Sequence, residues 1–104
     1  MPLTRSFRET VLEDMKRNPG FREAMLREGI DALLDDDLDL GKRILRDYIN
    51  ATIGFEKLGA KLKLSPKSLM RMFAPKGNPQ AKNLFAIIHA LQKHAGVELH
   101  VAAE

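Results

Sequence analysis

The sequence predicts an all-α domain of five to six helices that ends in one short β-strand. Apolar residues recur every three or four positions over most of the 104 residues, which is the spacing of amphipathic helices. Residues typical of helix ends separate these segments, and a clear apolar–polar alternation occurs only at residues 97–101. A hydrophobic fraction of 44% suits a folded globule, and the length suits one core, so residues 1–104 are expected to form a single domain.

The first two predicted helices are separated by a break at Asn18-Pro19-Gly20. Phe7 and the apolar residues after it predict a helix over residues 7–18. Pro19 suits the first position of the next helix, where its missing N–H costs nothing. This second helix is expected over residues 19–34, and its apolar stripe is Phe21, Ala24, Met25, Ile30, Leu33 and Leu34.

An acidic run, Asp35-Asp36-Asp37, precedes the third predicted helix over residues 38–52. Aspartate oxygens cap the exposed N–H groups at a helix start, and their charge suits the positive end of the dipole. We interpret the run as a helix start and not as a calcium loop, because no closing Glu follows it. The buried face of this helix is Leu40, Ile44, Leu45, Tyr48 and Ile49, and Gly54 ends it.

The segment at about residues 55–74 has the pattern of two helices joined by a short turn. Leu58 and Leu62 lie one turn apart and are expected to point inward, and Gly59 is small enough for another helix to cross closely. Ser65 is a good N-cap, and Pro66 falls at the favoured first helical position. The buried face of the second helix is Leu69, Met72 and Phe73, and Pro75 limits its end.

The outer face at the start of this second helix carries Lys67, Ser68 and Arg71. In a DNA-binding helix-turn-helix, these first residues reach the base edges in the major groove. Lys and Arg suit the acceptors of guanine, and a short hydroxyl is compatible with several bases, so we expect base contacts from all three. Phosphate contacts are expected from Lys57, Lys61, Lys63, Lys76, Asn78 and Lys82. The plainer interpretation is an αα-hairpin with basic solubilising residues.

The C-terminal part predicts a helix over residues 81–95, ended by Gly96, and then a strand. The core stripe of this helix is Leu84, Phe85, Ile87, Ile88 and Leu91. Val97, Leu99 and Val101 alternate with polar residues and would lie on one face of that strand. A lone strand leaves its backbone groups unpaired. We expect it to pair with a second copy across a dimer axis, while pairing with the sheet edge of another protein and fraying in water are the alternatives.

The charge distribution and the composition limit the classes of function that fit this chain. Residues 1–53 carry nine Lys or Arg and eleven Asp or Glu, a balance of −2, whereas residues 54–104 carry eight and three, a balance of +5. No acidic residue lies between Lys57 and Lys93, which favours a polyanion as partner. There is no secretory signal, membrane span or cysteine, so a cytoplasmic protein is expected. No catalytic constellation, metal ligand set or cofactor motif is found, so an enzyme is not expected.

The run from Leu58 to Phe73, followed by Lys76-Gly77-Asn78-Pro79, resembles the lambda-repressor-like (XRE-type) helix-turn-helix. It is most similar to the addiction module antidote proteins, the antitoxins of type II toxin–antitoxin pairs. The resemblance implies a homodimer that binds a palindromic operator, represses its own operon and neutralises a small, basic, ribonuclease-type toxin. The family often has Ala where Gly59 stands, and a Gln is common where this chain has Glu56 and Lys57.

The prediction is therefore a sequence-specific repressor of double-stranded DNA, with residues 1–53 as a helical lead-in, 54–95 as the helix-turn-helix core and 96–104 as the terminal strand. Two alternatives stay open. One is a stand-alone helix-turn-helix regulator without a toxin partner. The other is a helical protein-interaction module whose basic face is incidental.

Overall fold

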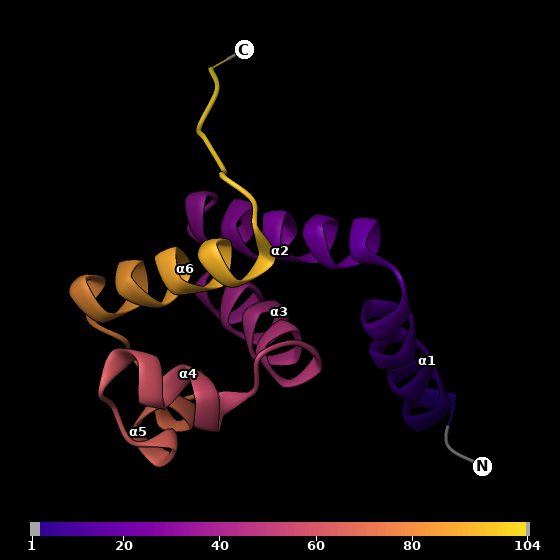
Figure 1. The fold of residues 1–104 in the computed structure, drawn as a ribbon, viewed down its shortest axis with the longest axis horizontal. Helices are drawn as coiled ribbons and strands as arrows, with labels where there is room; N and C mark the ends of the chain where they lie inside the picture. The colour runs from indigo at the N-terminus through magenta and orange to yellow at the C-terminus, as the bar shows by residue number, and fades with distance from the viewer. Residues whose placement is uncertain (1–2, 104) are drawn as a thin grey trace.

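Six α-helices account for most of the chain (Figure 1). The structure is a computed structural model that describes the backbone of residues 3–103 and the side chains of residues 9–103. The helices are α1 (Leu3–Arg17), α2 (Pro19–Leu34), α3 (Leu38–Ala51), α4 (Phe55–Leu62), α5 (Pro66–Met72) and α6 (Ala81–Ala95). No β-strand occurs within residues 3–103, so the all-α class is confirmed and the terminal strand is not observed in the single chain. The first helix begins at Leu3, earlier than predicted.

Helices α2, α3 and α5 each begin at a polar side chain that caps the helix. The Asp37 side chain accepts a hydrogen bond from the Leu40 N–H at 3.2 Å, so the acidic run does begin α3. Ser65 accepts from the Ser68 N–H at 3.1 Å, and Pro66 is the first residue of α5. Asn18 caps α2 in the same way, with a bond of 3.2 Å from the Phe21 N–H. Each cap satisfies a backbone donor that has no partner inside the helix.

The closest helix packing is between α2 and α3, at two glycines. A Cβ atom on Gly41 would lie 2.6 Å from Leu33 Cδ2 and 3.2 Å from the Gly29 carbonyl oxygen. A Cβ on Gly29 would lie 2.9 Å from Leu45 Cδ2. All three distances are shorter than a normal van der Waals contact, so the two glycines make room for Leu33, Leu45 and the Gly29 carbonyl where α3 meets α2.

One core joins both halves of the chain. Its fully buried side chains come from every helix: Met15, Leu26, Leu45, Tyr48, Ile49, Leu58, Leu69, Phe73, Ile87 and Leu91. The rings of Phe55 and Phe73 meet edge to face, with centroids 6.1 Å apart. Leu58 and Leu69 therefore fix α4 and α5 to the same core that holds the N-terminal helices. The predicted inward role of these residues is confirmed.

Four apolar residues predicted in buried stripes are exposed instead: Ala24, Leu34 at 61%, Leu40 at 39% and Phe85 at 69%. The prediction was wrong for these positions because helical spacing marks an apolar face but not whether another element covers it. Leu34 and Phe85 border a groove between α2 and α6 that no described segment fills. The predicted place of Phe7 in the first apolar stripe lies outside the described side chains.

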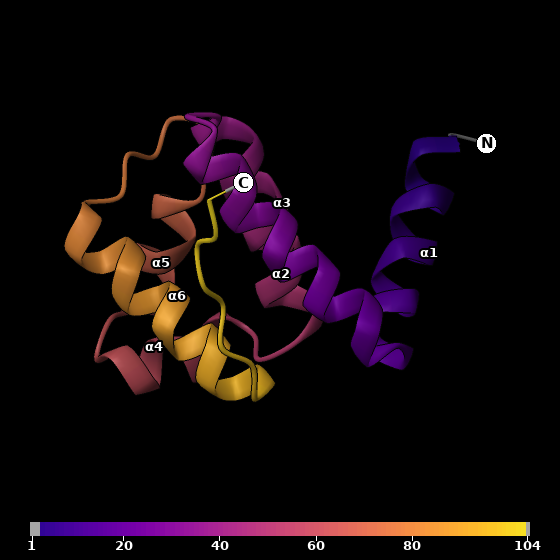
Figure 2. The same ribbon diagram turned by 90° about the horizontal axis from the view of Figure 1, so that it is seen from above.

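The C-terminal segment after α6 runs along α2 and then away from the body of the molecule (Figures 1 and 2). Gly96 ends α6 in the left-handed region, at φ 72°. The Leu99 N–H donates to Gln92 Oε1 at 2.8 Å, and Val97 and Leu99 pack partly against the core. Val101 is 80% exposed. Pairing through Val97, Leu99 and Val101 needs a second backbone, so the dimer strand stays a prediction.

Candidate nucleic-acid interface

The turn between α4 and α5 depends on the backbone conformation of Lys63 and on the small size of Gly59. Lys63 ends α4 in the left-handed region, at φ 58°, which is uncommon for a residue other than glycine. The Leu64 N–H then bonds to the Gly59 carbonyl at 2.9 Å. A Cβ atom on Gly59 would lie only 2.5 Å from the Leu64 carbonyl oxygen. The same Cβ would lie 3.5 Å from Leu69 Cδ1 and from the Pro66 nitrogen, so Gly59 makes room both for the backbone of the turn and for the approach of α5.

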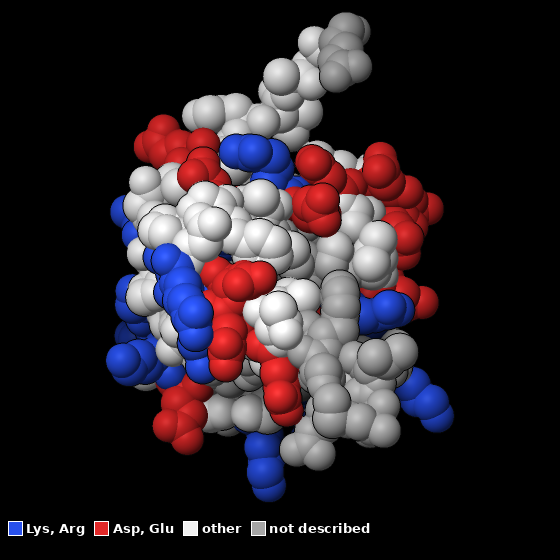
Figure 3. Space-filling view, turned by 90° about the vertical axis from the view of Figure 1, so that its right-hand side faces the viewer, with Lys and Arg blue, Asp and Glu red and all other residues white. Residues whose placement is uncertain are grey.

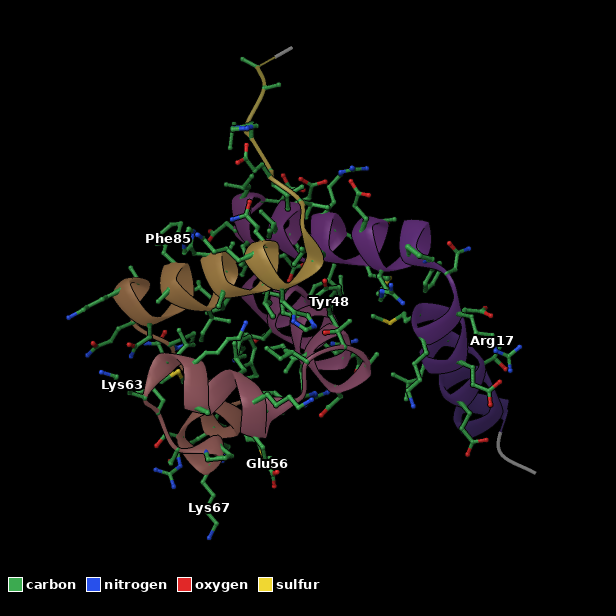
Figure 4. The ribbon with its side chains drawn as sticks, in the orientation of Figure 1. Arg17, Tyr48, Glu56, Lys63, Lys67 and Phe85 are labelled. Atoms are coloured by element: carbon green, nitrogen blue, oxygen red, sulfur yellow. The ribbon has the colours of Figure 1, made fainter. Side chains whose placement is uncertain are left out.

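The exposed face of α5 carries the residues predicted to contact bases. Lys67 is exposed and points away from the body of the molecule (Figure 4), and Arg71 is exposed as well. Ser68 is half-buried, and its hydroxyl accepts a hydrogen bond from the Ser65 hydroxyl at 2.8 Å. Leu69 is fully buried on the opposite face of α5 and so fixes the orientation of the helix.

A groove beside α5 brings four of the predicted contacts together. Ser68 and Arg71 line it from the helix, and Lys76 and Asn78 line it from the following loop. Gly77 allows this arrangement, because a Cβ atom there would lie 2.2 Å from the Arg71 carbonyl oxygen. The loop folds back against the end of α5 at that point. The arrangement offers two cations, an amide and a hydroxyl to one ligand surface.

A buried lysine that the sequence analysis did not single out holds this loop in place. Lys42 of α3 is 3% exposed, and its Nζ donates to the carbonyl oxygens of Ala74, Pro75 and Gly77 at 3.0, 3.1 and 2.7 Å. Asp39 lies 3.8 Å from the same nitrogen. The spacing of Lys42 from Leu45 and Ile49, at three and seven residues, is the signal that places it on the buried face.

Two further cations line a cleft beside Lys42. Arg43 and Arg46 follow it on α3, and Phe73 and Pro75 form the other wall. The Nε atom of Arg46 is buried and has no hydrogen-bond partner among the described residues. Positive charge therefore continues from the loop onto α3, although residues 1–53 are acidic overall.

The remaining predicted phosphate contacts are exposed but do not line the groove. Lys57 and Lys61 lie one turn apart on α4, Lys63 is at the turn, and Lys82 is in the first turn of α6. Figure 4 shows Lys63 and Lys67 pointing in different directions, while Glu56 projects on the same side as Lys67. The Glu56 carboxylate therefore lies on the side of the molecule where Lys67 would contact a polyanion.

Asp and Glu side chains are prominent on the face at the α1 end of the molecule, with Lys and Arg side chains among them (Figure 3). A cleft lined by Lys16, Arg22 and His94 also lies near this end. Arg22 Nη1 donates to the Met15 and Lys16 carbonyl oxygens at 3.0 and 2.8 Å. Burial raises the pKa of the Tyr48 phenol beneath the cleft, and the Arg22 charge partly opposes that shift.

No group of three or more His, Cys, Asp or Glu side chains within the described residues is arranged to hold a metal ion. None of the helices in residues 3–103 is long and apolar enough to cross a membrane.

Comparison of the chain with protein-family models, with curated proteins and with solved structures found no match. The fold and the site define a small all-helical protein with a basic two-helix unit, α4 and α5, on one side.

Proposed function

We propose that this chain is a sequence-specific DNA-binding repressor in which α5 is the recognition helix. The observation that carries the proposal is the groove that places Ser68 and Arg71 of α5 beside Lys76 and Asn78 of the loop, with Lys67 projecting from the same helix. A short helix that presents such side chains from its first turns suits the major groove of DNA.

Each side chain in this arrangement has a role that its chemistry allows. Arg71 and Lys67 are hydrogen-bond donors for guanine O6 and N7, and Ser68 has one proton to donate. Lys76 and Asn78 suit backbone phosphates, which set the position of the helix in the groove. Lys42 acts indirectly, because it holds the loop that carries Lys76 and Asn78.

A homodimer would give the two recognition helices that a palindromic operator requires. Val97 and Leu99 already pack against the core of their own chain, so a second copy would pair through the backbone of residues 97–101. The resemblance of residues 58–73 to the antitoxins supports the further proposal that the protein acts in the cytoplasm and neutralises a ribonuclease-type toxin.

The DNA proposal is tested by selection from a random pool of double-stranded DNA, followed by affinity measurements on the selected duplex at fixed salt. Arg71→Ala is expected to lower affinity by about five- to 150-fold, equivalent to about 1–3 kcal/mol for one base contact. Lys93→Ala removes an exposed lysine from the far end of α6 and serves as the control. Selection of no sequence, or equal binding by Arg71→Ala, would contradict the proposal.

The antitoxin role has a separate test. Each gene adjacent to this one is expressed alone and then together with this chain. Growth arrest with RNA degradation that co-expression relieves is the expected result. A chain that binds an operator while no neighbouring product is toxic would be a stand-alone regulator.

A further inference from the structure

An apolar groove lies between the end of α2, the start of α3 and the first half of α6. Its volume is about 270 Å³, and its walls include Ile30, Leu34, Leu38, Leu84, Phe85 and Ile88. Leu34 is 61% exposed and Phe85 is 69% exposed. Contiguous apolar surface that leaves large side chains in water is typical of an interaction site.

The α2 side of this groove is acidic. Asp36 is part of its wall, and Asp31 lies with Ile30 and Leu34 along the adjoining cleft beside the C-terminal segment. Asp35 stands between Leu34 and Asp36, and all three carboxylates are exposed and form no ion pair with another described residue. Asp35 and Asp36 lie between the C-terminal end of α2 and the N-terminal end of α3, so the two helix dipoles oppose each other there and the negative charge comes from the carboxylates themselves.

Two basic residues stand against these three carboxylates. Arg27 lines the same adjoining cleft as Asp31 and lies 3.5 Å from Glu23, and Lys82 lies three residues before Phe85 on α6. The surface is thus an apolar channel with an excess of negative charge on its rim. Such a rim repels DNA. It would also repel a second copy that used the same groove, because an isologous interface brings the same patch of both copies together.

We infer that this groove docks a segment of a partner protein whose apolar side chains are flanked by lysine or arginine. Charge complementarity with Asp31, Asp35 and Asp36 selects that partner, and Leu34 and Phe85 supply the apolar contact. Figure 4 shows Phe85 on the side of the molecule opposite to Lys67, so the groove is accessible while α5 is in use. The inference does not rest on DNA binding.

The probe for this site is a labelled amphipathic helical peptide of Leu and Lys, about 15 residues long, measured by fluorescence anisotropy against the full chain. The same pattern with Glu in place of Lys is the control peptide. The Leu/Lys peptide is expected to bind, and the Leu/Glu peptide to bind at least tenfold more weakly. Increasing salt should weaken binding, because the rim contacts are ionic.

Variants of the protein test whether the Leu/Lys peptide binds in the groove. Leu34→Ser with Phe85→Ser, and separately Asp31→Asn with Asp35→Asn and Asp36→Asn, should each lower affinity by about tenfold or more. Leu40→Ser is the matched control, because Leu40 is an exposed leucine that does not line the groove. Circular dichroism confirms that each variant is folded, and the affinity of each for the selected duplex is measured in parallel.

Three results would overturn the inference. They are equal binding of both peptides, peptide binding that the groove variants leave unchanged, and conversion of a dimer to a monomer by Leu34→Ser with Phe85→Ser in sedimentation. The last result would show that a second copy occupies the groove. Loss of DNA binding by Arg71→Ala with peptide binding intact would separate this site from the proposed repressor function.

Discussion

The Nζ atom of Lys42 lies 2.7 Å from the carbonyl oxygen of Gly77, so a residue of α3 fixes the loop that completes the α5 groove. The same ammonium group bonds to the carbonyl oxygens of Ala74 and Pro75. A single charged side chain therefore satisfies three backbone acceptors just after α5, where carbonyl groups lack helical partners. The N-terminal half of the chain thus takes part in shaping the candidate interface.

Replacing Lys42 with Met keeps much of its volume but removes all three hydrogen bonds. The Ala74 carbonyl keeps its bond from the Gly77 N–H, but the Pro75 and Gly77 carbonyls lose the Lys42 donor, and this loss is expected to lower the free energy of unfolding by about 2–3 kcal/mol. Urea unfolding measures this loss, and hydrogen exchange should show faster exchange at residues 74–78. Lys82→Met is the control, because Lys82 is exposed, and its effect should stay within about 0.5 kcal/mol. A Lys42→Met protein as stable as wild type would contradict this account.

Helix bounds were the part of the fold most accurately predicted from the sequence, because the signals that set them are local. Residues 19–34 and 81–95 were predicted to the residue, from Pro19 and Gly96 as end signals. The caps at Asp37 and Ser65 act within three residues of their partners. Such interactions depend on the neighbouring sequence alone, so pattern and propensity suffice.

Tertiary contacts account for what the sequence did not predict. The role of Lys42 depends on a loop more than 30 residues away, and the glycines at positions 29 and 41 matter only because α2 and α3 meet there. Phe85 continues an apolar stripe, but no element covers it. Of the predicted contacts, Ser68, Arg71, Lys76 and Asn78 share a groove, since the fold returns the loop to α5. Their predicted role in DNA binding stays a prediction.

The α4–α5 turn predicts that Gly59→Ala destabilises the protein. Alanine gains about 1 kcal/mol in helix propensity over glycine. Its Cβ would lie 2.5 Å from the Leu64 carbonyl oxygen, a backbone atom that cannot rotate away, and overpacking of this kind costs about 1–3 kcal/mol. The clash should therefore exceed the propensity gain, giving a lower midpoint in thermal unfolding.

Gly20→Ala is the matched control for this substitution. Its Cβ would lie 3.3 Å from Asn18 Oδ1, the side-chain oxygen that caps α2, so this oxygen has to move by only a few tenths of an ångström. The gain in helix propensity should offset that small shift and leave stability close to that of the wild type. If Gly59→Ala and Gly20→Ala change the midpoint equally, the proposed backbone clash does not govern the turn.

The buried phenol of Tyr48 is expected to make the free energy of unfolding fall at high pH. Burial raises its pKa above the ordinary value of 10.0, so the unfolded chain releases the phenol proton first as pH rises. The stabilisation is therefore complete below about pH 10 and is lost as pH rises through the folded-state pKa. Tyr48 is the only tyrosine, so ultraviolet absorbance of tyrosinate reports this group alone. Its midpoint should be higher in native buffer than in denaturant, and Tyr48→Phe should reduce the alkaline loss of stability. Identical midpoints would show that the phenol is not held in a buried environment.

The terminal segment allows a test of the proposed dimer that spares the core. Deleting residues 97–104 would also remove Val97 and Leu99 from their contacts with the core, so loss of a dimer would be ambiguous. The Val97 and Leu99 N–H groups already donate to Gln92, so strand pairing would use the opposite edge, which carries the His100 N–H. The His100 side chain is 81% exposed, and His100→Pro removes that donor while leaving the core contacts in place. His100→Ser keeps the donor and is the control. Sedimentation equilibrium should show a dimer for the wild type and His100→Ser and a weaker dimer for His100→Pro. A monomeric wild type, or equal association of all three proteins, would mean that residues 97–101 do not pair across a two-fold axis.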